Sequence, residues 1–310
     1  MSIAFLYAGQ GSQHPGMGAD LYETYPQFRA VLDGAQLDFD LKEVSFQDSQ
    51  GVLNETRYTQ PCMVAFAVGV TQILADLGIT PDYAAGLSLG EYSALQAAGV
   101  FTPQQAISLV AFRGQVMAQA SQGVACGMTA VLGLEREKLE QACQQAGALG
   151  VVCIANYNCP GQLVLGGHQS AVDEAARLAK EMGARRCMPL KVSGPFHTPL
   201  LKPAGDALAE KFRGETFGEM HIPVLFNCLG HEMGPEDTIP ALLERQVQSS
   251  VYMEDTIRRL AALGVDTIVE IGPGKVLSGF VRKTAPEIKT YAVETVADIQ
   301  ALAQALKEEN

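Results

Sequence analysis

The sequence contains no tryptophan, and only 22 lysine and arginine residues stand against 34 aspartate and glutamate residues. The resulting net charge of −12 would repel a phosphate backbone over most of the surface, so nucleic-acid binding is disfavoured. Charged residues make up 18% of the chain and hydrophobic residues 47%, which excludes an intrinsically disordered protein. With 310 residues, the chain has room for two domains, or for one large domain with an insertion.

Signals for export, membrane insertion and metal binding are also missing. No lysine or arginine precedes the apolar N-terminal run, and Thr71, Gln72 and Asp76 interrupt the most apolar stretch, so neither a signal peptide nor a membrane span is predicted. The seven cysteines form no Cys-x-x-Cys pair, and His231 lacks a second histidine at metalloprotease spacing. We therefore expect no metal, no cofactor and, because buried thiols suit a reducing compartment, a soluble cytoplasmic protein.

Strand and helix patterns alternate along most of the chain, which predicts an α/β fold with a mainly parallel sheet. Expected strands include residues 3–7, 83–86 and 267–271, and Pro61 to Leu77 is an expected buried helix with Thr59 as its cap. In the middle of the chain the order changes to β-α-β-β-α-β, the ferredoxin-like arrangement. We therefore predict a large α/β domain over residues 1–126 and 194–310, and an inserted ferredoxin-like small domain over residues 127–193.

The pentapeptide Gly86-Leu87-Ser88-Leu89-Gly90 lies between an expected strand and an expected helix. Glycine at both ends permits a sharp turn that exposes the serine hydroxyl, and the following helix directs backbone N–H groups toward the same point. This pattern is typical of a serine nucleophile, so we predict that Ser88 forms a covalent intermediate. The alternative is an ordinary serine in a glycine-rich turn.

His197 is the leading candidate for the general base, because glycine, proline and phenylalanine make the loop Ser193-Gly194-Pro195-Phe196 before it rigid. A loop histidine without a chemical role is the alternative. The segment Gly9-Gln10-Gly11 follows the first expected strand and could supply oxyanion-binding N–H groups. A dinucleotide-binding loop is a second interpretation, although the third glycine of that motif is replaced by His14.

Arg113 is the only charged residue between Tyr92 and Leu134. The three- and four-residue spacing of its apolar neighbours places it on the apolar stripe of an expected helix. A buried guanidinium needs an anion, because an unpaired one costs several kcal/mol. The anion could be a distant aspartate or glutamate, or it could be a carboxylate on the substrate; the sequence leaves both open.

These motifs together resemble the malonyl-CoA:acyl carrier protein transacylases and the related acyltransferase domains of polyketide synthases. The resemblance extends over nearly the whole chain. The motifs that carry it are Gly9-Gln10-Gly11-Ser12-Gln13, Gly86-Leu87-Ser88-Leu89-Gly90-Glu91-Tyr92, Arg113, Pro195-Phe196-His197 and Ile271-Gly272-Pro273-Gly274. It implies an α/β-hydrolase-like large domain with a ferredoxin-like small domain. It also implies transfer of a malonyl group from malonyl-CoA to the phosphopantetheine thiol of an acidic acyl carrier protein, in fatty-acid or polyketide synthesis.

The resemblance further implies a role for each site residue. Ser88 corresponds to the acylated nucleophile, His197 to its general base, and Gln246 to the glutamine whose main-chain carbonyl orients the histidine. The backbone N–H groups of Gln10 and Leu89 match the oxyanion hole, and Arg113 matches the arginine that pairs with the malonyl carboxylate.

The chain departs from the family pattern at Leu87, where the family often has histidine. This difference removes a polar group near the thioester and leaves the catalytic roles unchanged. A serine esterase or thioesterase on a related fold is the alternative function, and it would need an acid between Ser88 and His197 in chain order. Asp173 and Glu174 lie in that interval, within an expected helix of the small domain, where they are poorly placed.

Overall fold

The structure is a computed structural model that describes residues 1–308 of the chain. The chain divides into two compact units, each assembled from separate segments. Unit 1 contains residues 1–114, residues 217–225 and the described residues from 259 onward. Unit 2 contains residues 115–216 and 226–258.

Unit 1 is built on parallel strands in the order β11-β10-β1-β2-β7. Their side chains form a near-continuous hydrophobic run, as expected for strands that are covered on both faces, and Phe5, Leu6 and Tyr7 are at most 1% exposed. The strands are β1 (Ile3–Tyr7), β2 (Tyr83–Gly86), β7 (Val224–Phe226), β10 (Thr267–Ile271) and β11 (Lys289–Val293). The strands predicted at 3–7, 83–86 and 267–271 are thus confirmed.

The helices of unit 1 pack on these strands or on one another. They are α1 (Ala19–Thr24), α2 (Pro26–Asp33), α3 (Leu41–Phe46), α4 (Thr56–Asp76), α5 (Gly90–Ala97), α12 (Val276–Thr284) and α13 (Val296–Glu308), with α6 (Pro103–Ser121) beginning here. Thr102 caps α6 as predicted, because its Oγ1 accepts a hydrogen bond from the Gln105 N–H at 3.2 Å.

Helix α4 differs from the sequence-based prediction at its start. It begins at Thr56, so Pro61 lies inside the helix and not in its first position. Thr59 does not cap it; its Oγ1 lies 2.5 Å from the carbonyl oxygen of Leu53 and 3.1 Å from that of Glu55, both of which precede the helix. By length and composition α4 could cross a membrane, but 83% of its most apolar window is buried inside the structure, which makes it a core helix.

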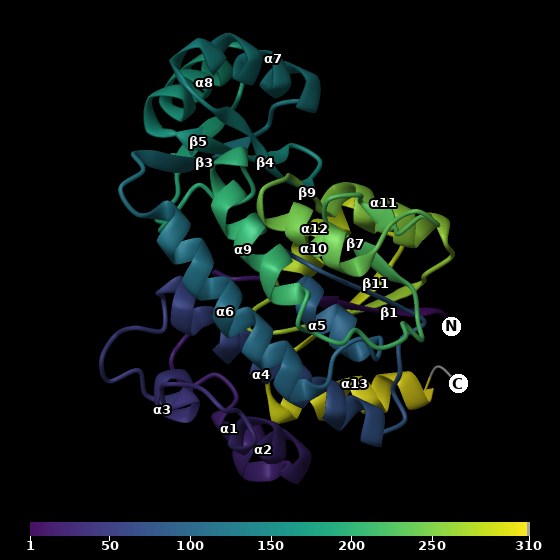
Figure 1. The fold of residues 1–310 in the computed structure, drawn as a ribbon. Coiled ribbons are helices and arrows are strands. Elements are labelled where there is room, and N and C mark those ends of the chain that lie inside the picture. The colour runs from purple at the N-terminus through teal and green to yellow at the C-terminus, as the bar shows by residue number, and fades with distance from the viewer. Residues whose placement is uncertain (309–310) are drawn as a thin grey trace. The chain divides into compact units, whose positions relative to one another are not determined.

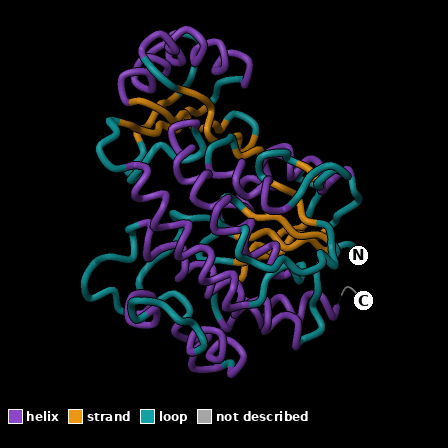
Figure 2. The backbone as a smooth tube through the Cα atoms, viewed as in Figure 1, coloured by secondary structure: helices purple, strands orange, loops and turns teal. Residues whose placement is uncertain are grey.

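Unit 2 contains the predicted ferredoxin-like motif. Its elements follow in the order β3 (Cys126–Leu132), α7 (Arg136–Ala146), β4 (Val152–Cys159), β5 (Gln162–His168), α8 (Gln169–Glu181) and β6 (Arg186–Pro189). The strands pair antiparallel in the order β6-β3-β5-β4. Helices α7 and α8 lie on one face of this sheet (Figure 1), and Figure 2 shows the strands as one layer beneath them. Together they enclose a core that includes Leu139, Leu165 and Val172.

The rest of unit 2 extends the motif. It contributes the 3-10 helices Gly147–Leu149 and Pro199–Leu201, and the elements α9 (Lys202–Phe212), β8 (His231–Glu232), α10 (Ile239–Val247), β9 (Val251–Tyr252) and the start of α11 (Met253–Ala262). Strand β9 pairs in parallel with β4 and so adds a strand beside the motif.

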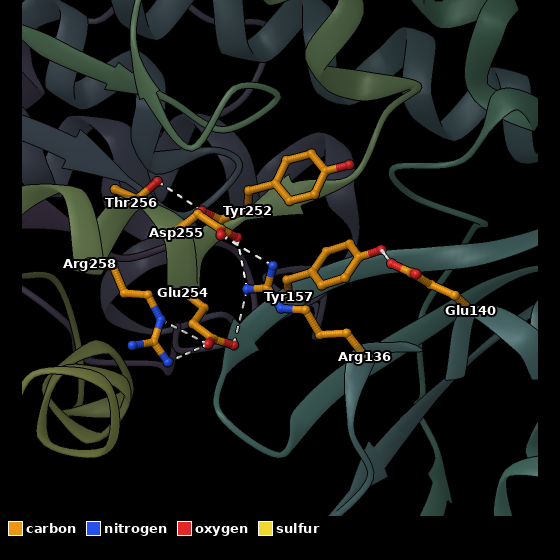
Figure 3. Close-up of polar contacts among 8 residues, drawn as sticks. All are labelled: Arg136, Glu140, Tyr157, Tyr252, Glu254, Asp255, Thr256 and Arg258. Carbon is orange, nitrogen blue, oxygen red and sulfur yellow. Dashed lines mark hydrogen bonds and ion pairs between the residues drawn. The ribbon is translucent and has the colours of Figure 1, made fainter. Parts of the chain in front are cut away.

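A polar network fixes this added segment to the ferredoxin-like motif (Figure 3). The guanidinium of Arg136 in α7 makes two hydrogen bonds to the carboxylate of Asp255, at 2.9 and 3.2 Å, and an ion pair with Glu254. The same guanidinium lies over the ring of Tyr157, which stacks on Tyr252 with 4.9 Å between the ring centroids. Bidentate geometry of this kind holds both partners in one orientation.

The fold class is α/β, in agreement with the prediction. The compact units differ in extent from the predicted domains, because residues 115–126, 194–216 and 226–258 cluster with the ferredoxin-like motif in unit 2. The motif itself spans residues 126–189, close to the predicted small domain at 127–193. The domain boundaries therefore stay a prediction about how the chain divides functionally.

Candidate active site

Ser88 lies at the tip of the turn that joins β2 to α5. Its φ angle is +52°, in the left-handed region that residues with a Cβ rarely adopt. Such strain persists only where the surroundings enforce it, and it concentrates at functional sites. Here the turn is held by the N–H of Leu87, which donates to the carbonyl of Tyr7 at 2.9 Å, and by the N–H of Glu91, which donates to the carbonyl of Ser88 at 3.2 Å.

The two flanking glycines are required by close backbone contacts. A Cβ added at Gly86 would lie 2.1 Å from the carbonyl carbon of Gly90, and one added at Gly90 would lie 2.3 Å from the carbonyl oxygen of Tyr7. Neither contact is possible, so the turn depends on the absence of side chains at both positions. The sequence signature is therefore explained by the packing of the turn on itself and on β1.

The first loop lies beside the same turn. A Cβ on Gly9 would be 2.5 Å from the carbonyl oxygen of Leu87, so the two backbones approach closely. The next residue, Gln10, donates from its side-chain Nε2 to Thr56 Oγ1 at 3.1 Å, which ties the loop to the start of α4. Leu89 directly precedes α5, where backbone N–H groups point out of the helix end. The structure thus gathers Gln10, Ser88 and Leu89 in unit 1.

Arg113 in α6 reaches the nucleophile. Its side chain is 1% exposed, and its Nη2 donates to Ser88 Oγ at 3.2 Å. Its Nη1 donates to Gln60 Oε1 in α4 at 2.9 Å, and the guanidinium lies 5.5 Å from the centroid of the Tyr92 ring. Burial lowers the pKa of the Arg113 guanidinium, whereas interactions with Tyr92 and Glu91 act in the opposite direction.

His197 lies in unit 2. It is 3% exposed and, like Ser88, has a left-handed backbone, with φ +60°. Its Nδ1 lies 2.9 Å from the main-chain carbonyl oxygen of Gln246, and its backbone N–H donates to the carbonyl of Val247 at 3.2 Å. A carbonyl oxygen can only accept, so Nδ1 carries the proton and Nε2 is the basic nitrogen of the ring.

The predicted site residues thus fall into two groups. Gln10, Ser88, Leu89 and Arg113 belong to unit 1, where the structure brings Arg113 to the serine, and His197 and Gln246 belong to unit 2, where they are hydrogen-bonded. The sequence analysis missed Gln60 and the ring of Tyr92 as partners of Arg113. Within residues 1–308, no group of three or more His, Cys, Asp or Glu side chains could hold a metal ion.

Comparisons with known proteins point to one family. The family model for the acyl transferase domain matches residues 4–304. The malonyl CoA-acyl carrier protein transacylase of Bacillus subtilis is 42% identical over 311 residues, covering 99% of this chain and 98% of the relative. A Staphylococcus aureus protein of the same name is 37% identical, covering 96% of this chain and 97% of the relative.

Solved structures give the same result. The crystal structure of MCAT from Streptococcus pneumoniae is similar with a TM-score of 0.94 and 44% identity, over 98% of this chain and all of that one. A malonyl-transacylase solved in complex with its type II PKS acyl-carrier protein has a TM-score of 0.94 and 35% identity, over 98% of this chain and all of that one.

Proposed function

The chain belongs to the acyl transferase domain family, and on that premise we propose that it transfers a malonyl group from malonyl-CoA to the phosphopantetheine thiol of an acyl carrier protein. The observation that carries this proposal is the buried guanidinium of Arg113, 3.2 Å from the Ser88 hydroxyl. A cation beside a nucleophile favours an acyl group that ends in a carboxylate. Malonyl-CoA offers such a group, and acetyl-CoA does not.

In the first half-reaction, the Ser88 Oγ forms a bond to the thioester carbonyl carbon while His197 Nε2 accepts the hydroxyl proton. The hydrogen bond from Nδ1 to the Gln246 carbonyl keeps Nε2 unprotonated and stabilises the imidazolium that results. Negative charge on the substrate oxygen is stabilised by the N–H groups of Gln10 and Leu89, a contribution of about 2.7–4 kcal/mol per donor in comparable sites. The carbon–sulfur bond then breaks, and coenzyme A leaves with the proton from His197.

In the second half-reaction, the carrier-protein thiol attacks the malonyl ester on Ser88. His197 accepts the thiol proton and returns it to the serine oxygen as the ester bond breaks. This ping-pong scheme needs no group beyond the two substrates and the side chains named. The product is a malonyl thioester for carbon-chain assembly, in fatty-acid or polyketide synthesis.

A hydrolase would use the same serine, and two observations favour transfer. The partner of His197 Nδ1 is a main-chain carbonyl and not a carboxylate. Asp173 and Glu174, the acids weighed above for that role, have partners on their own helix α8, because Asp173 accepts from Gln169 and Glu174 pairs with Arg177. Neither is placed as the acid of an esterase triad.

Identification of the acylated residue tests the proposal. Incubation with radiolabelled malonyl-CoA should place one malonyl group on Ser88, found by peptide mass, and Ser88→Ala should carry no label. Ser93→Ala is the matched control, because Ser93 is a nearby serine, buried in α5, that lies outside the proposed machinery. Label retained on Ser88→Ala would contradict the scheme. Release of free malonate, without acceptor and as fast as transfer, would favour a thioesterase.

A cytoplasmic location is part of the same proposal. All seven cysteines are free thiols, and four of them are buried. Free thiols persist in a reducing compartment, which is also where coenzyme A thioesters are used.

A further inference from the structure

The loop that contains Gln10 is held in place by polar contacts. Residues 9–16, with the sequence Gly-Gln-Gly-Ser-Gln-His-Pro-Gly, contribute no side chain to the hydrophobic core. The side chain of Gln13 donates from Nε2 to Asn54 Oδ1 at 2.8 Å, which fixes one point of the loop. The direction of the Gln10 backbone N–H therefore depends on hydrogen bonds made by its polar neighbours.

His14, four residues after Gln10, makes hydrogen bonds from both ring nitrogens. Its Nδ1 lies 3.0 Å from the carbonyl oxygen of Pro15, and its Nε2 lies 2.5 Å from Oε1 of Glu294. A carbonyl oxygen and an ionised carboxylate can only accept, so both nitrogens carry a proton and the ring is an imidazolium. In agreement with this geometry, the hydrogen bond to Glu294 raises the pKa of His14.

Glu294 lies between β11 and α13, and its two carboxylate oxygens accept from different segments of unit 1. Oε1 accepts from His14, and Oε2 accepts from the backbone N–H of Gly274 at 2.9 Å. The backbone of Glu294 is itself fixed, because its N–H donates to the side chain of Asp298 in α13 at 3.2 Å. Both partners of the side chain are donors, so an amide of the same shape would turn its NH₂ group toward one of them.

We propose that Glu294 is a positioning residue of the transfer reaction, because its contact with the cationic ring of His14 fixes the loop that presents the Gln10 N–H to the substrate oxygen. This inference rests on the proposed function. At Gly9 the same loop approaches the turn of the nucleophile, where an added Cβ would lie 2.5 Å from the carbonyl oxygen of Leu87. Because an oxyanion donor acts only when it is close to the developing charge, a shift of this loop lowers the rate.

The other charged groups at this junction leave the pairing of His14 with Glu294 intact. Asp20 on α1 and Asp298 on α13 accept hydrogen bonds from backbone N–H groups at the start of α13. Lys275, in the loop that also contains Gly274, is exposed. When the pH rises through the folded-state pKa of His14, the ring loses one of its two donors, and the loop loses one of its two contacts.

Two substitutions of opposite charge test the inference. Glu294→Gln removes a negative charge and His14→Gln removes a positive one, yet both break the same contact. We expect each to slow acyl-enzyme formation at saturating malonyl-CoA at least about fivefold, part of the roughly 100-fold effect of losing an oxyanion donor, with KM within about threefold of wild type. The double variant should be no slower than the slower single variant, because the two residues act as one unit.

Glu287→Gln is the matched control, because Glu287 is exposed between α12 and β11 and the substitution changes the net charge by the same amount. It should acylate at the wild-type rate. Titration of the His14 ring by NMR is the second readout: the wild type should titrate above pH about 6.5, and Glu294→Gln closer to that ordinary value.

Three results would overturn the inference. They are opposite effects of Glu294→Gln and His14→Gln on the acylation rate, equal losses in Glu294→Gln and Glu287→Gln, and a wild-type His14 ring that titrates at its ordinary value. Absence of a malonyl group on Ser88 in the wild type would instead reject the proposed function.

Discussion

Replacement of Gly90 by alanine tests whether the strained turn positions the nucleophile. The added Cβ would lie 2.3 Å from the Tyr7 carbonyl oxygen, 2.8 Å from its carbon and 3.0 Å from the Ala8 oxygen. All three atoms are backbone at the end of a central strand, so they cannot rotate away. An ordinary contact begins near 3.4 Å, so the turn must move by about 1 Å.

That displacement predicts the size of the effect. A 1 Å misplacement of a reacting group can cost about 100-fold in rate, so Gly90→Ala should acylate Ser88 about 100-fold more slowly. Overpacking should also lower the free energy of unfolding by about 1–3 kcal/mol. Rapid-quench measurement of acyl-enzyme formation and chemical denaturation would determine the two values.

A glycine-to-alanine substitution at Gly279, away from the turn, provides the control. At Gly279 in α12, an added Cβ would find its nearest neighbour, the Arg282 side chain, at 4.0 Å. Alanine is favoured over glycine inside a helix by about 0.5–1 kcal/mol, so Gly279→Ala should be slightly more stable and fully active. Wild-type acylation by Gly90→Ala would refute the claim that the turn geometry places the nucleophile.

Two further predictions concern charged groups in unit 1. Arg113→Ala should lose about 10- to 150-fold in kcat/KM with malonyl-CoA, the value of a hydrogen bond to a charged group, and far less with acetyl-CoA; equal losses would assign Arg113 a structural role. The hydrogen bond to Glu294 raises the pKa of His14, so its stabilisation is complete below pH about 6.5 and is lost as the pH rises through the folded-state value. The midpoint of wild-type unfolding should therefore fall more steeply above that pH than the midpoint of His14→Gln, and parallel curves would contradict this.

The sequence alone predicted the local parts of the site well. The two glycines that the turn at Ser88 needs lie within five positions of each other and are visible as a pattern, although the close contact of Gly90 is with Tyr7 in β1. The order of the ferredoxin-like motif was likewise readable, because each strand and helix has its own periodicity. Pairing in the order β6-β3-β5-β4 then follows from the topology that this element order typically adopts.

The predicted start of helix α4 is wrong, because packing in the core overrides the local preference of proline. The sequence predicts that the buried helix starts at Pro61 with Thr59 as its cap, which agrees with the preference of proline for the first turn of a helix. The helix begins five residues earlier, at Thr56, and tolerates proline in its interior because most of its residues are buried against the core.

Arg113 shows why the contacts of the site residues could not be predicted without the three-dimensional structure. Its apolar spacing identified a buried guanidinium but not the groups around it, because Gln60 lies 53 residues away and Ser88 lies 25 residues away. The same sequence pattern fits an arginine in a structural salt bridge and an arginine that binds the substrate. The two roles differ in which groups the guanidinium contacts. Here the hydrogen bonds of Nη1 and Nη2 end on an amide and on the nucleophile itself. A guanidinium that donates to the nucleophile itself is placed to bind a group attached to that oxygen, which a salt bridge elsewhere in the core would not be.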